Sequence, residues 1–108
     1  MNQSLPDMTS LREEIVNTAQ KAYREGMMAA TSGNLSCYDA ASGCIAITPS
    51  GMDYTIMKPE DIVIIDLDGN VLSGHKPSSE WKMHAEIYRH LPQYLSLIHI
   101  SEPTRRSY

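Results

Sequence analysis

A short run of β-branched residues, Ile62-Val-Ile-Ile-Asp66, constrains the fold of this chain more than any other feature. Successive positions of the run are apolar, so a strand built from it presents apolar side chains to both faces of its sheet. Such a pattern is typical of an interior strand. The sequence therefore predicts a sheet with residues 62–66 near its middle, and a length of 108 residues fits one domain of ordinary size.

Strand and turn signals on both sides of this run predict its neighbours. Strand-like segments at Asn34–Tyr38 and Cys44–Thr48 are separated by the turn residues 39–43, which indicates a hairpin. Downstream, the Asp68-Gly69 turn signal precedes a partner strand that begins at Val71-Leu72. Both patterns place strands next to turns that reverse the direction of the chain.

Apolar residues at three- and four-residue spacing predict two helices. The first follows a Ser10-Leu-Arg-Glu13 capping box and ends at Gly26. The second covers Glu80–His90, with Ser78 or Ser79 as its candidate N-cap. Strands and helices within one domain place the chain in the α/β class.

Composition limits the classes of function. Hydrophobic residues make up 42% and charged residues 20%, as in soluble globular proteins, and a net charge of −4 lacks the basic surplus that nucleic acids or anionic membranes require. We therefore expect no nucleic-acid or membrane partner. The N-terminus lacks the basic and apolar regions of a signal peptide, which favours the cytoplasm. Cys37 and Cys44 are too few for a disulfide framework, so they are expected to be small buried hydrophobes.

Three polar segments combine flexible backbone with hydroxyl or amide donors beside a predicted strand end or helix start: Thr31–Ser36, Thr48–Gly51 and Pro77–Trp81. Free amides at such places favour anions, and Gly33 and Gly51 allow the backbone to approach a phosphate closely. The segments therefore indicate a site for a phosphorylated ligand. Ordinary caps and turns are the alternative that spacing leaves open.

Glu80 is the residue in these segments best suited to chemistry. A carboxylate in the first turn of a helix is stabilised by the helix dipole, and beside a phosphate site it could act as a general base or a metal ligand, although it could also only stabilise the helix. His84 shares its helix face one turn later, but one carboxylate and one imidazole are too few ligands for a metal. We therefore expect His84 to be a packing or surface residue.

In this order, the three polar segments resemble the class II aldolase/adducin family, and the resemblance covers about Leu11–Gln93. It implies a three-layer α/β/α sandwich around a mixed, mostly antiparallel sheet. It also implies zinc (Zn²⁺) as cofactor, a small-molecule sugar phosphate as substrate, and assembly of the full-length protein as a homo-oligomer, a tetramer. The enzymes of this family are aldolases, epimerases and dehydratases.

The resemblance also implies roles for individual residues. Substrate-binding positions are matched by Gly33, Asn34, Ser50, Gly51, Ser78 and Ser79. Glu80 matches the acid/base residue of the aldolase branch, where it also contacts the zinc when no substrate is bound. The following Trp81 favours that branch, because the epimerase branch usually has aspartate without the tryptophan. The implied reaction is retro-aldol cleavage of a ketose 1-phosphate, such as L-fuculose 1-phosphate, to dihydroxyacetone phosphate and an aldehyde.

Two alternatives stay open. A pentulose-phosphate 4-epimerase or a dehydratase on the same scaffold is the alternative among enzymes. An adducin-like, non-enzymatic interaction domain is the alternative of a different class. Glu80 and the intact serines argue against it, because a pure binding module has no need of an acid/base residue.

The end of the chain does not continue this design. Leu95–Arg105 resembles the translation of a transposase adapter used to prepare sequencing libraries, so residues 94–108 are expected to be a non-native tail after an N-terminal domain fragment at 1–93. The family's zinc histidines begin with a His-x-His pair on the strand expected after Gln93, a spacing that Leu97–Ile100 lacks. The fragment is thus expected to be inactive by itself. A genuine short strand at Leu97–Ile100 is the alternative.

Overall fold

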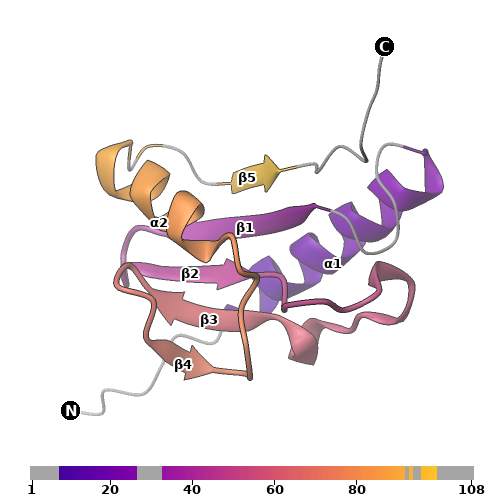
Figure 1. Ribbon diagram of the computed structural model, residues 1–108, viewed down its shortest axis with the longest axis horizontal. Helices are drawn as coiled ribbons and strands as arrows, with labels where there is room; N and C mark the ends of the chain where they lie inside the picture. Colours follow the sequence, from indigo (N-terminus) through magenta and orange to yellow (C-terminus); the bar gives the residue numbers. More distant parts are fainter. Residues whose placement is uncertain (1–7, 27–32, 92, 94–95, 100–108) are drawn as a thin grey trace.

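A five-stranded sheet forms the centre of the computed structural model, which describes residues 8–26, 33–91, 93 and 96–99. The strands lie in the order β4-β3-β2-β1-β5, and each described pairing is antiparallel. Their bounds are β1 Asn34–Asp39, β2 Cys44–Ile47, β3 Val63–Asp66, β4 Val71–Ser73 and β5 Ser96–His99. The interior position of β3 and the β1–β2 hairpin confirm the predictions for these segments (Figure 1).

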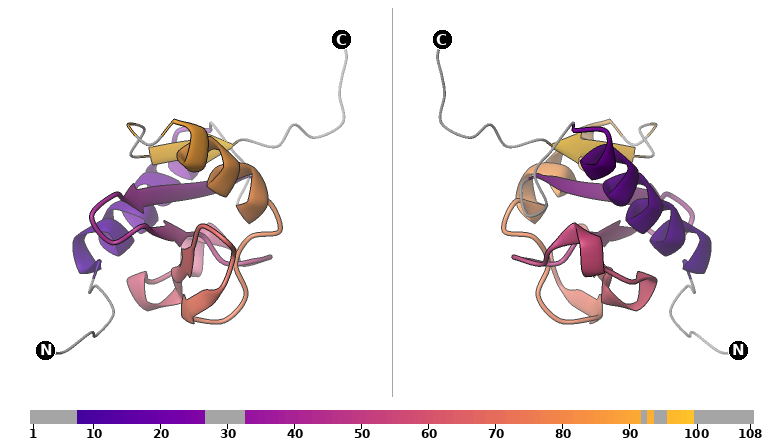
Figure 2. Two further views of the ribbon diagram at one scale, coloured as in Figure 1. Left: turned by 90° about the vertical axis from the view of Figure 1, so that its left-hand side faces the viewer. Right: turned by 90° about the vertical axis from the view of Figure 1, so that its right-hand side faces the viewer.

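One helix covers each face of the sheet. Helix α1 spans Thr9–Arg24 and helix α2 spans Trp81–His90, and the side views show the sheet between them (Figure 2). Two short 3-10 turns, η1 at Tyr54–Ile56 and η2 at Pro59–Asp61, connect β2 to β3. The three layers agree with the α/β/α sandwich that the family resemblance implies.

The core is divided between the two faces by the alternation of side chains along the strands. Ala46 and Ile64, which are partners across β2 and β3, pack beneath α1 with Ile15. The neighbouring positions pack beneath α2, in a cluster comprising Tyr38, Ile45, Ile47, Val63, Ile65, Ala85 and Tyr88. The continuous apolar run of β3 is therefore explained by burial on both sides.

The start of α1 differs from the predicted capping box. The helix begins at Thr9, its N-cap is Met8 with φ of 53°, and no side chain caps it. Arg12 N donates to Met8 O at 2.9 Å, so helical hydrogen bonding begins before Ser10. Met8 is buried in the cluster beneath α1. Burial of this side chain, which no local pattern reveals, sets the helix start, and the assignment of Ser10 as N-cap is wrong.

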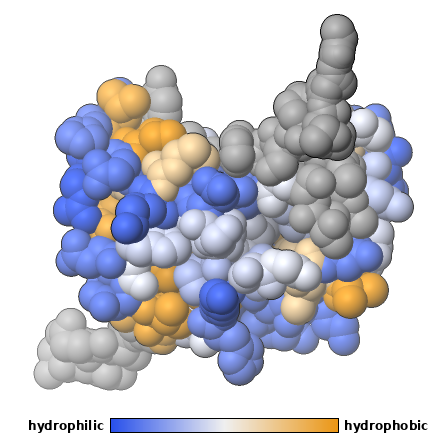
Figure 3. Space-filling view, viewed as in Figure 1, coloured by the Kyte–Doolittle hydropathy of each residue, from blue (hydrophilic) through white to orange (hydrophobic). Residues whose placement is uncertain are grey.

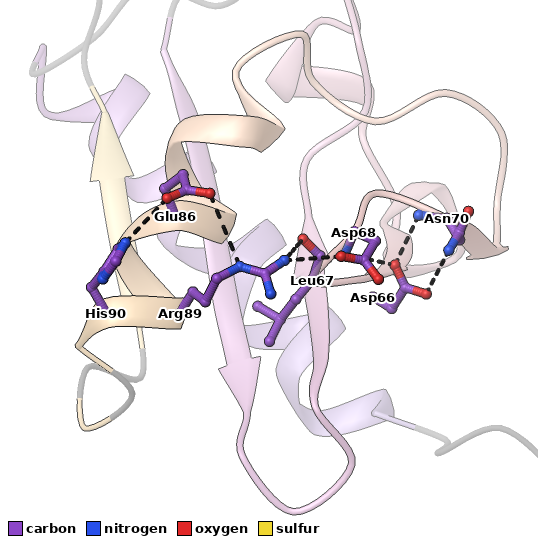
Figure 4. Close-up of polar contacts among 7 residues, drawn as sticks. All are labelled: Asp66, Leu67, Asp68, Asn70, Glu86, Arg89 and His90. Carbon is purple, nitrogen blue, oxygen red and sulfur yellow. Dashed lines mark hydrogen bonds and ion pairs between the residues drawn. The ribbon is translucent and has the colours of Figure 1, made fainter.

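Helix α2 is fastened to the β3–β4 turn by its second half and by its first residue. Arg89 donates to Leu67 O at 2.8 Å and forms an ion pair with Asp68 at 3.0 Å (Figure 4). Trp81 packs so closely over Gly69 that a Cβ at that glycine would overlap the indole ring. These contacts orient the helix on the sheet and so determine where its first residues lie.

The surface carries few large apolar side chains among the described residues, and they are dispersed. Ile56 and Val71 are the most exposed of them, and Figure 3 shows hydrophobic areas separated by hydrophilic ones on the face it displays. Within the described ranges, neither helix has the length and apolar character needed to cross a membrane. Cys37 and Cys44 are buried and free, as predicted.

The end of the chain contributes a strand. Ser96–His99 forms β5, which pairs antiparallel with β1 from Cys37↔Ser96 to Asn34↔His99. This is close to the short strand left open as the alternative for this segment, while the non-native origin of residues 94–108 stays a prediction. Residues 31 and 32 of the polar segment Thr31–Ser36 lie outside the described residues.

Candidate functional site

The loop after β2 and the loop before α2 are joined by backbone hydrogen bonds. Pro49 and Pro77 form an isolated antiparallel bridge, and Ser78 N donates to Thr48 O at 2.9 Å. Proline lacks an N–H, so the hydrogen bonds of this bridge come from the neighbouring residues, and Ser50 N donates to Lys76 O at 3.0 Å. The bridge brings the second and third polar segments together, although they lie on opposite sides of β3 and β4 in the sequence.

The first polar segment is attached to the second by Thr48. Its Oγ1 accepts from Leu35 N at 3.3 Å, and its backbone N donates to Leu35 O at 3.0 Å. From the other side, the Tyr54 hydroxyl donates to Gly33 O at 2.5 Å. The backbone at Gly33-Asn34 is therefore held between the end of β2 and η1.

The three segments enclose a pocket of about 260 Å³. Its lining comprises Gly33, Asn34, Pro49, Ser50, Gly51, Met52, Tyr54, Ser78, Ser79 and Glu80. Every residue to which the family resemblance assigned a substrate-binding or catalytic role lines this one pocket. Convergence of residues from three distant segments on one volume is not expected of ordinary caps and turns, which satisfy their own backbone locally.

Three lining residues were missed by sequence reasoning: Pro49, Met52 and Tyr54. Tyr54 reaches the pocket from η1. This turn is too short to show an apolar periodicity, so the sequence could not indicate which side of it faces the pocket. Burial raises the pKa of its phenol, and a hydrogen bond with Thr48 lowers the pKa by less. The phenol is therefore neutral near pH 7 and serves as a hydrogen-bond donor to Gly33, not as a base.

The electrostatic character of the pocket comes from neutral donors and one carboxylate. Glu80 carries the only charged side chain among the described residues that line it. Gly33 and Gly51 have φ of 82° and 70°, a backbone region that L side chains rarely adopt, and they leave the pocket wall without a Cβ at these points. The remaining polar groups of the lining residues are serine hydroxyls, the Tyr54 hydroxyl, the Asn34 side-chain amide and backbone amides. Such a wall can bind an anion through dipoles instead of formal charges.

The start of α2 positions the serines and Glu80. Ser78 is buried, and its Oγ accepts from Glu80 N at 3.1 Å, while Ser79 and Glu80 are exposed. The N-cap position belongs to Glu80, without a side-chain cap, so neither serine is the N-cap. Ser78 instead stabilises the turn that leads into the helix, and this turn presents Ser79 and Glu80 at the pocket.

His84 does not join Glu80 in a metal site. Its side chain is fully buried, with Nδ1 2.6 Å from Ser36 Oγ and Nε2 hydrogen-bonded to Asn34 Oδ1. Of the two predicted environments for His84, packing or surface, the structure shows the packed one. Within residues 8–26, 33–91, 93 and 96–99, no group of three or more His, Cys, Asp and Glu side chains could hold a metal ion. Glu80 alone does not make a zinc site, so these residues do not fit a complete one.

Comparisons with known proteins agree with this fold. The sequence profile of the Class II Aldolase and Adducin N-terminal domain matches residues 13–105. A 5-deoxy-D-ribulose 1-phosphate aldolase from Bacillus thuringiensis serovar kurstaki (strain ATCC 35866 / NRRL B-4488 / HD73) is 44% identical over 93 residues, which cover 85% of this chain and 44% of that protein.

Solved structures of similar proteins share this fold. An L-fuculose 1-phosphate aldolase superposes with a TM-score of 0.81 at 37% identity, covering 84% of this chain and 43% of that one. YgbL from Escherichia coli, described as an aldolase, epimerase or decarboxylase, superposes with a TM-score of 0.82 at 30% identity, covering 91% and 47%. The chain thus spans less than half the length of these relatives. With a family profile that matches most of its residues and a shared fold, the chain belongs to the class II aldolase/adducin family.

Proposed function

We propose that this chain supplies the phosphate pocket and the acid/base carboxylate of a metal-dependent sugar-phosphate aldolase. The reaction is cleavage of a ketose 1-phosphate, such as L-fuculose 1-phosphate, to dihydroxyacetone phosphate and an aldehyde. One observation carries the proposal: three segments distant in sequence converge on one pocket that has neutral donors in its wall and a single carboxylate at the start of α2.

Phosphate is the ligand that best suits the wall of this pocket. The backbone at Gly33 and Gly51 can approach an anion closely, and the hydroxyl groups of Ser50 and Ser79 add donors. A phosphate held at this point orients the rest of the substrate relative to Glu80. Such positioning converts binding free energy into a correct geometry for reaction.

Glu80 would act on the substrate carbon next to the carbonyl group. When the carbon–carbon bond breaks, the hydroxyl group on the departing carbon loses its proton and becomes the aldehyde carbonyl. The electron pair of the broken bond moves toward the ketose carbonyl and leaves an enediolate, which must be protonated at the carbon next to that carbonyl to give dihydroxyacetone phosphate. An exposed carboxylate at the pocket can carry this proton, and it removes the same proton in the direction of synthesis.

Zinc dependence of the full-length protein is part of the proposal, because class II aldolases are metal-dependent. Glu80 is the one pocket residue that could contribute a ligand, and the others would have to come from outside the described residues. The mechanism of this chain is therefore limited to binding, orientation and proton transfer.

A pentulose-phosphate 4-epimerase or dehydratase is the second candidate, and the similarity to YgbL, whose description includes an epimerase, favours keeping it. The same pocket would hold the phosphate in either case. An adducin-like interaction domain is less consistent with a carboxylate at a phosphate-sized pocket, since protein binding alone does not require that group.

Two measurements test the proposal. In a titration of the 108-residue chain with inorganic phosphate, we expect NMR shifts at the amides of Gly33, Gly51 and Ser79, with the remote Gly43 amide as control. Absence of these shifts would overturn the phosphate pocket. The second measurement uses the protein encoded by the complete reading frame that contains this chain. Its release of dihydroxyacetone phosphate from L-fuculose 1-phosphate or 5-deoxy-D-ribulose 1-phosphate should require added zinc. Epimerised product without cleavage would favour the second candidate.

A further inference from the structure

A chain of buried polar side chains connects α2 to β1 directly behind the pocket. Its members are His84 and Tyr88, both 0% exposed, Ser36 at 1% and Asn34 at 3%. Tyr88 packs in the otherwise apolar cluster beneath α2. Burial of polar groups in such a place costs free energy unless they are hydrogen-bonded, so each of these side chains needs a partner.

The secondary structure accounts for the way these residues meet. His84 and Tyr88 are four residues apart on one face of a helix, and Asn34 and Ser36 are two apart on one face of a strand. Ser36 Oγ lies 2.6 Å from His84 Nδ1 and 2.8 Å from the Tyr88 hydroxyl, while His84 Nε2 contacts Asn34 Oδ1. Each helix residue therefore contacts the strand at a defined position.

The chemistry of the partners assigns the direction of the hydrogen bonds. Asn34 Oδ1 can only accept, so Nε2 of His84 carries the proton in this contact. In the neutral imidazole, Nδ1 is then an acceptor, and it receives the Ser36 hydroxyl proton. The Tyr88 hydroxyl donates to Ser36, to Oγ or to the backbone oxygen at 3.2 Å. In these three contacts the donors point the same way, from Tyr88 toward Asn34, an arrangement in which the bonds strengthen one another.

We infer that His84 is a positioning residue of the phosphate pocket, because it holds the Asn34 amide in one orientation. The oxygen and the NH2 group of an amide lie on opposite branches, so an oxygen bound to His84 directs the NH2 group away from α2. Asn34 itself lines the pocket, where an NH2 group is the half of the amide that an anion can use. This inference rests on the proposed phosphate site and adds a residue outside its lining.

The same contact couples the two sides of the pocket. Glu80 is at the start of α2 and His84 is one turn later, while Asn34 begins β1. A helix that carries both Glu80 and His84 therefore cannot shift relative to β1 without breaking the contact with Asn34. His84 thus helps to keep the carboxylate and the phosphate wall at a fixed separation.

Two amide substitutions in the 108-residue chain form a matched pair. His84→Gln keeps an N–H donor close to the position of Nε2, whereas His84→Asn reaches only as far as Nδ1. Loss of one well-placed hydrogen bond corresponds to roughly threefold to tenfold in affinity. We therefore expect His84→Asn to weaken inorganic phosphate binding by about tenfold and His84→Gln by less than about threefold.

Two controls separate positioning from general stability. Tyr88→Phe removes the far end of the network, and we expect it to lower the thermal unfolding midpoint while leaving the phosphate dissociation constant within about twofold. In a chain that already has Asn34→Ala, adding His84→Asn should weaken phosphate binding no further, because the residue through which His84 acts is gone. Independent, additive effects of the two substitutions would overturn the inference.

A spectroscopic measurement tests the contact itself without any variant. The ¹⁵N shifts of the His84 ring should report a neutral imidazole with its proton on Nε2. A proton on Nδ1 would mean that the Asn34 amide is turned the other way and would overturn the inference even if His84→Asn fails to fold. If the unchanged chain does not bind phosphate, the proposed site and this inference both fail. If it binds but His84→Asn and His84→Gln behave alike, only the role of His84 fails.

Discussion

Two regions of the molecule have similar sequences of turn-forming residues but opposite structural consequences. The β3–β4 turn, Asp66–Asn70, uses its polar groups on itself: Asp66 accepts from Asp68 N, from Asn70 N and from Asn70 Nδ2 (Figure 4). The three pocket segments instead line a shared volume with their polar groups. Glycine and polar turn-forming residues are thus common to both, and only the pocket segments surround a shared volume.

The difference lies in where the hydrogen-bond partners come from. In the β3–β4 turn, Asp66 accepts hydrogen bonds from residues at most four positions away, and Arg89 of α2 donates to Leu67 O. In the pocket, Thr48 bonds to Leu35 and to Ser78, which are distant in sequence. Local satisfaction produces a closed turn, whereas long-range bonds place several chain segments around an open space.

Glu80→Gln in the full-length enzyme should have the largest effect. The amide keeps the shape of the carboxylate but cannot carry the proton, so we expect cleavage to fall about 100-fold to 10,000-fold while phosphate binding remains. The measurement is a steady-state assay of dihydroxyacetone phosphate release. Near-normal turnover would show that Glu80 only stabilises the start of α2 and that the pocket is not the catalytic region.

Gly69→Ala should be the most destabilising of the glycine substitutions, because the new Cβ would overlap the Trp81 ring. Gly43→Ala is the matched control: its φ of 73° is close to the 89° of Gly69, but nothing lies within 4 Å of its Cβ position. Both variants share the backbone strain, and only one adds overpacking, which costs about 1–3 kcal/mol. Equal decreases in the free energy of unfolding of the two variants, measured by chemical denaturation, would show that Trp81 can move away from the β3–β4 turn at little cost.

Gly51→Ala should separate the two regions. Its φ is 70° and its Cβ position is open, so we expect a loss of stability close to that of Gly43→Ala. Phosphate binding should nevertheless weaken by about threefold to tenfold, because the new methyl group lies at a point where the backbone lines the pocket and hinders close approach of the anion. Gly43→Ala again serves as control in the same titration. Unchanged affinity would place the phosphate away from Gly51.

Asp66 should give the smallest effect, as a pH dependence. Burial would raise its pKa, but hydrogen bonds from Asn70, Asp68 and Gly69 together outweigh this and lower the pKa below its usual value. Its stabilisation is therefore present above the unfolded pKa near 4 and is lost as the pH falls through the folded pKa. The thermal unfolding midpoint should fall between pH 5 and pH 2. Asp66→Asn should make this fall smaller by about 2–4 °C, a modest effect because the carboxylate is largely solvated. If Asp66→Asn leaves the fall of the unfolding midpoint at low pH unchanged, the stability of the turn does not depend on this charge.

Local patterns in the sequence were sufficient for most secondary structure and for the composition of the site. The β-branched run at 62–66 predicted an interior strand, and the three polar segments contained every residue later found at the pocket apart from Met52 and Tyr54. These successes share one cause. Side-chain period, β-branching and turn chemistry act within a few residues, so they can be recognised without knowing the rest of the fold.

Contacts between distant segments required the tertiary structure. The start of α1 depends on burial of Met8, the pocket depends on the bridge between Pro49 and Pro77, and the orientation of Asn34 depends on His84. Each is decided by strand order and by the packing of the two helices on the sheet, and therefore by the sum of many packing contacts. The sequence by itself determined which groups are available for chemistry, and only the packing of the sheet decided which of them face the same volume.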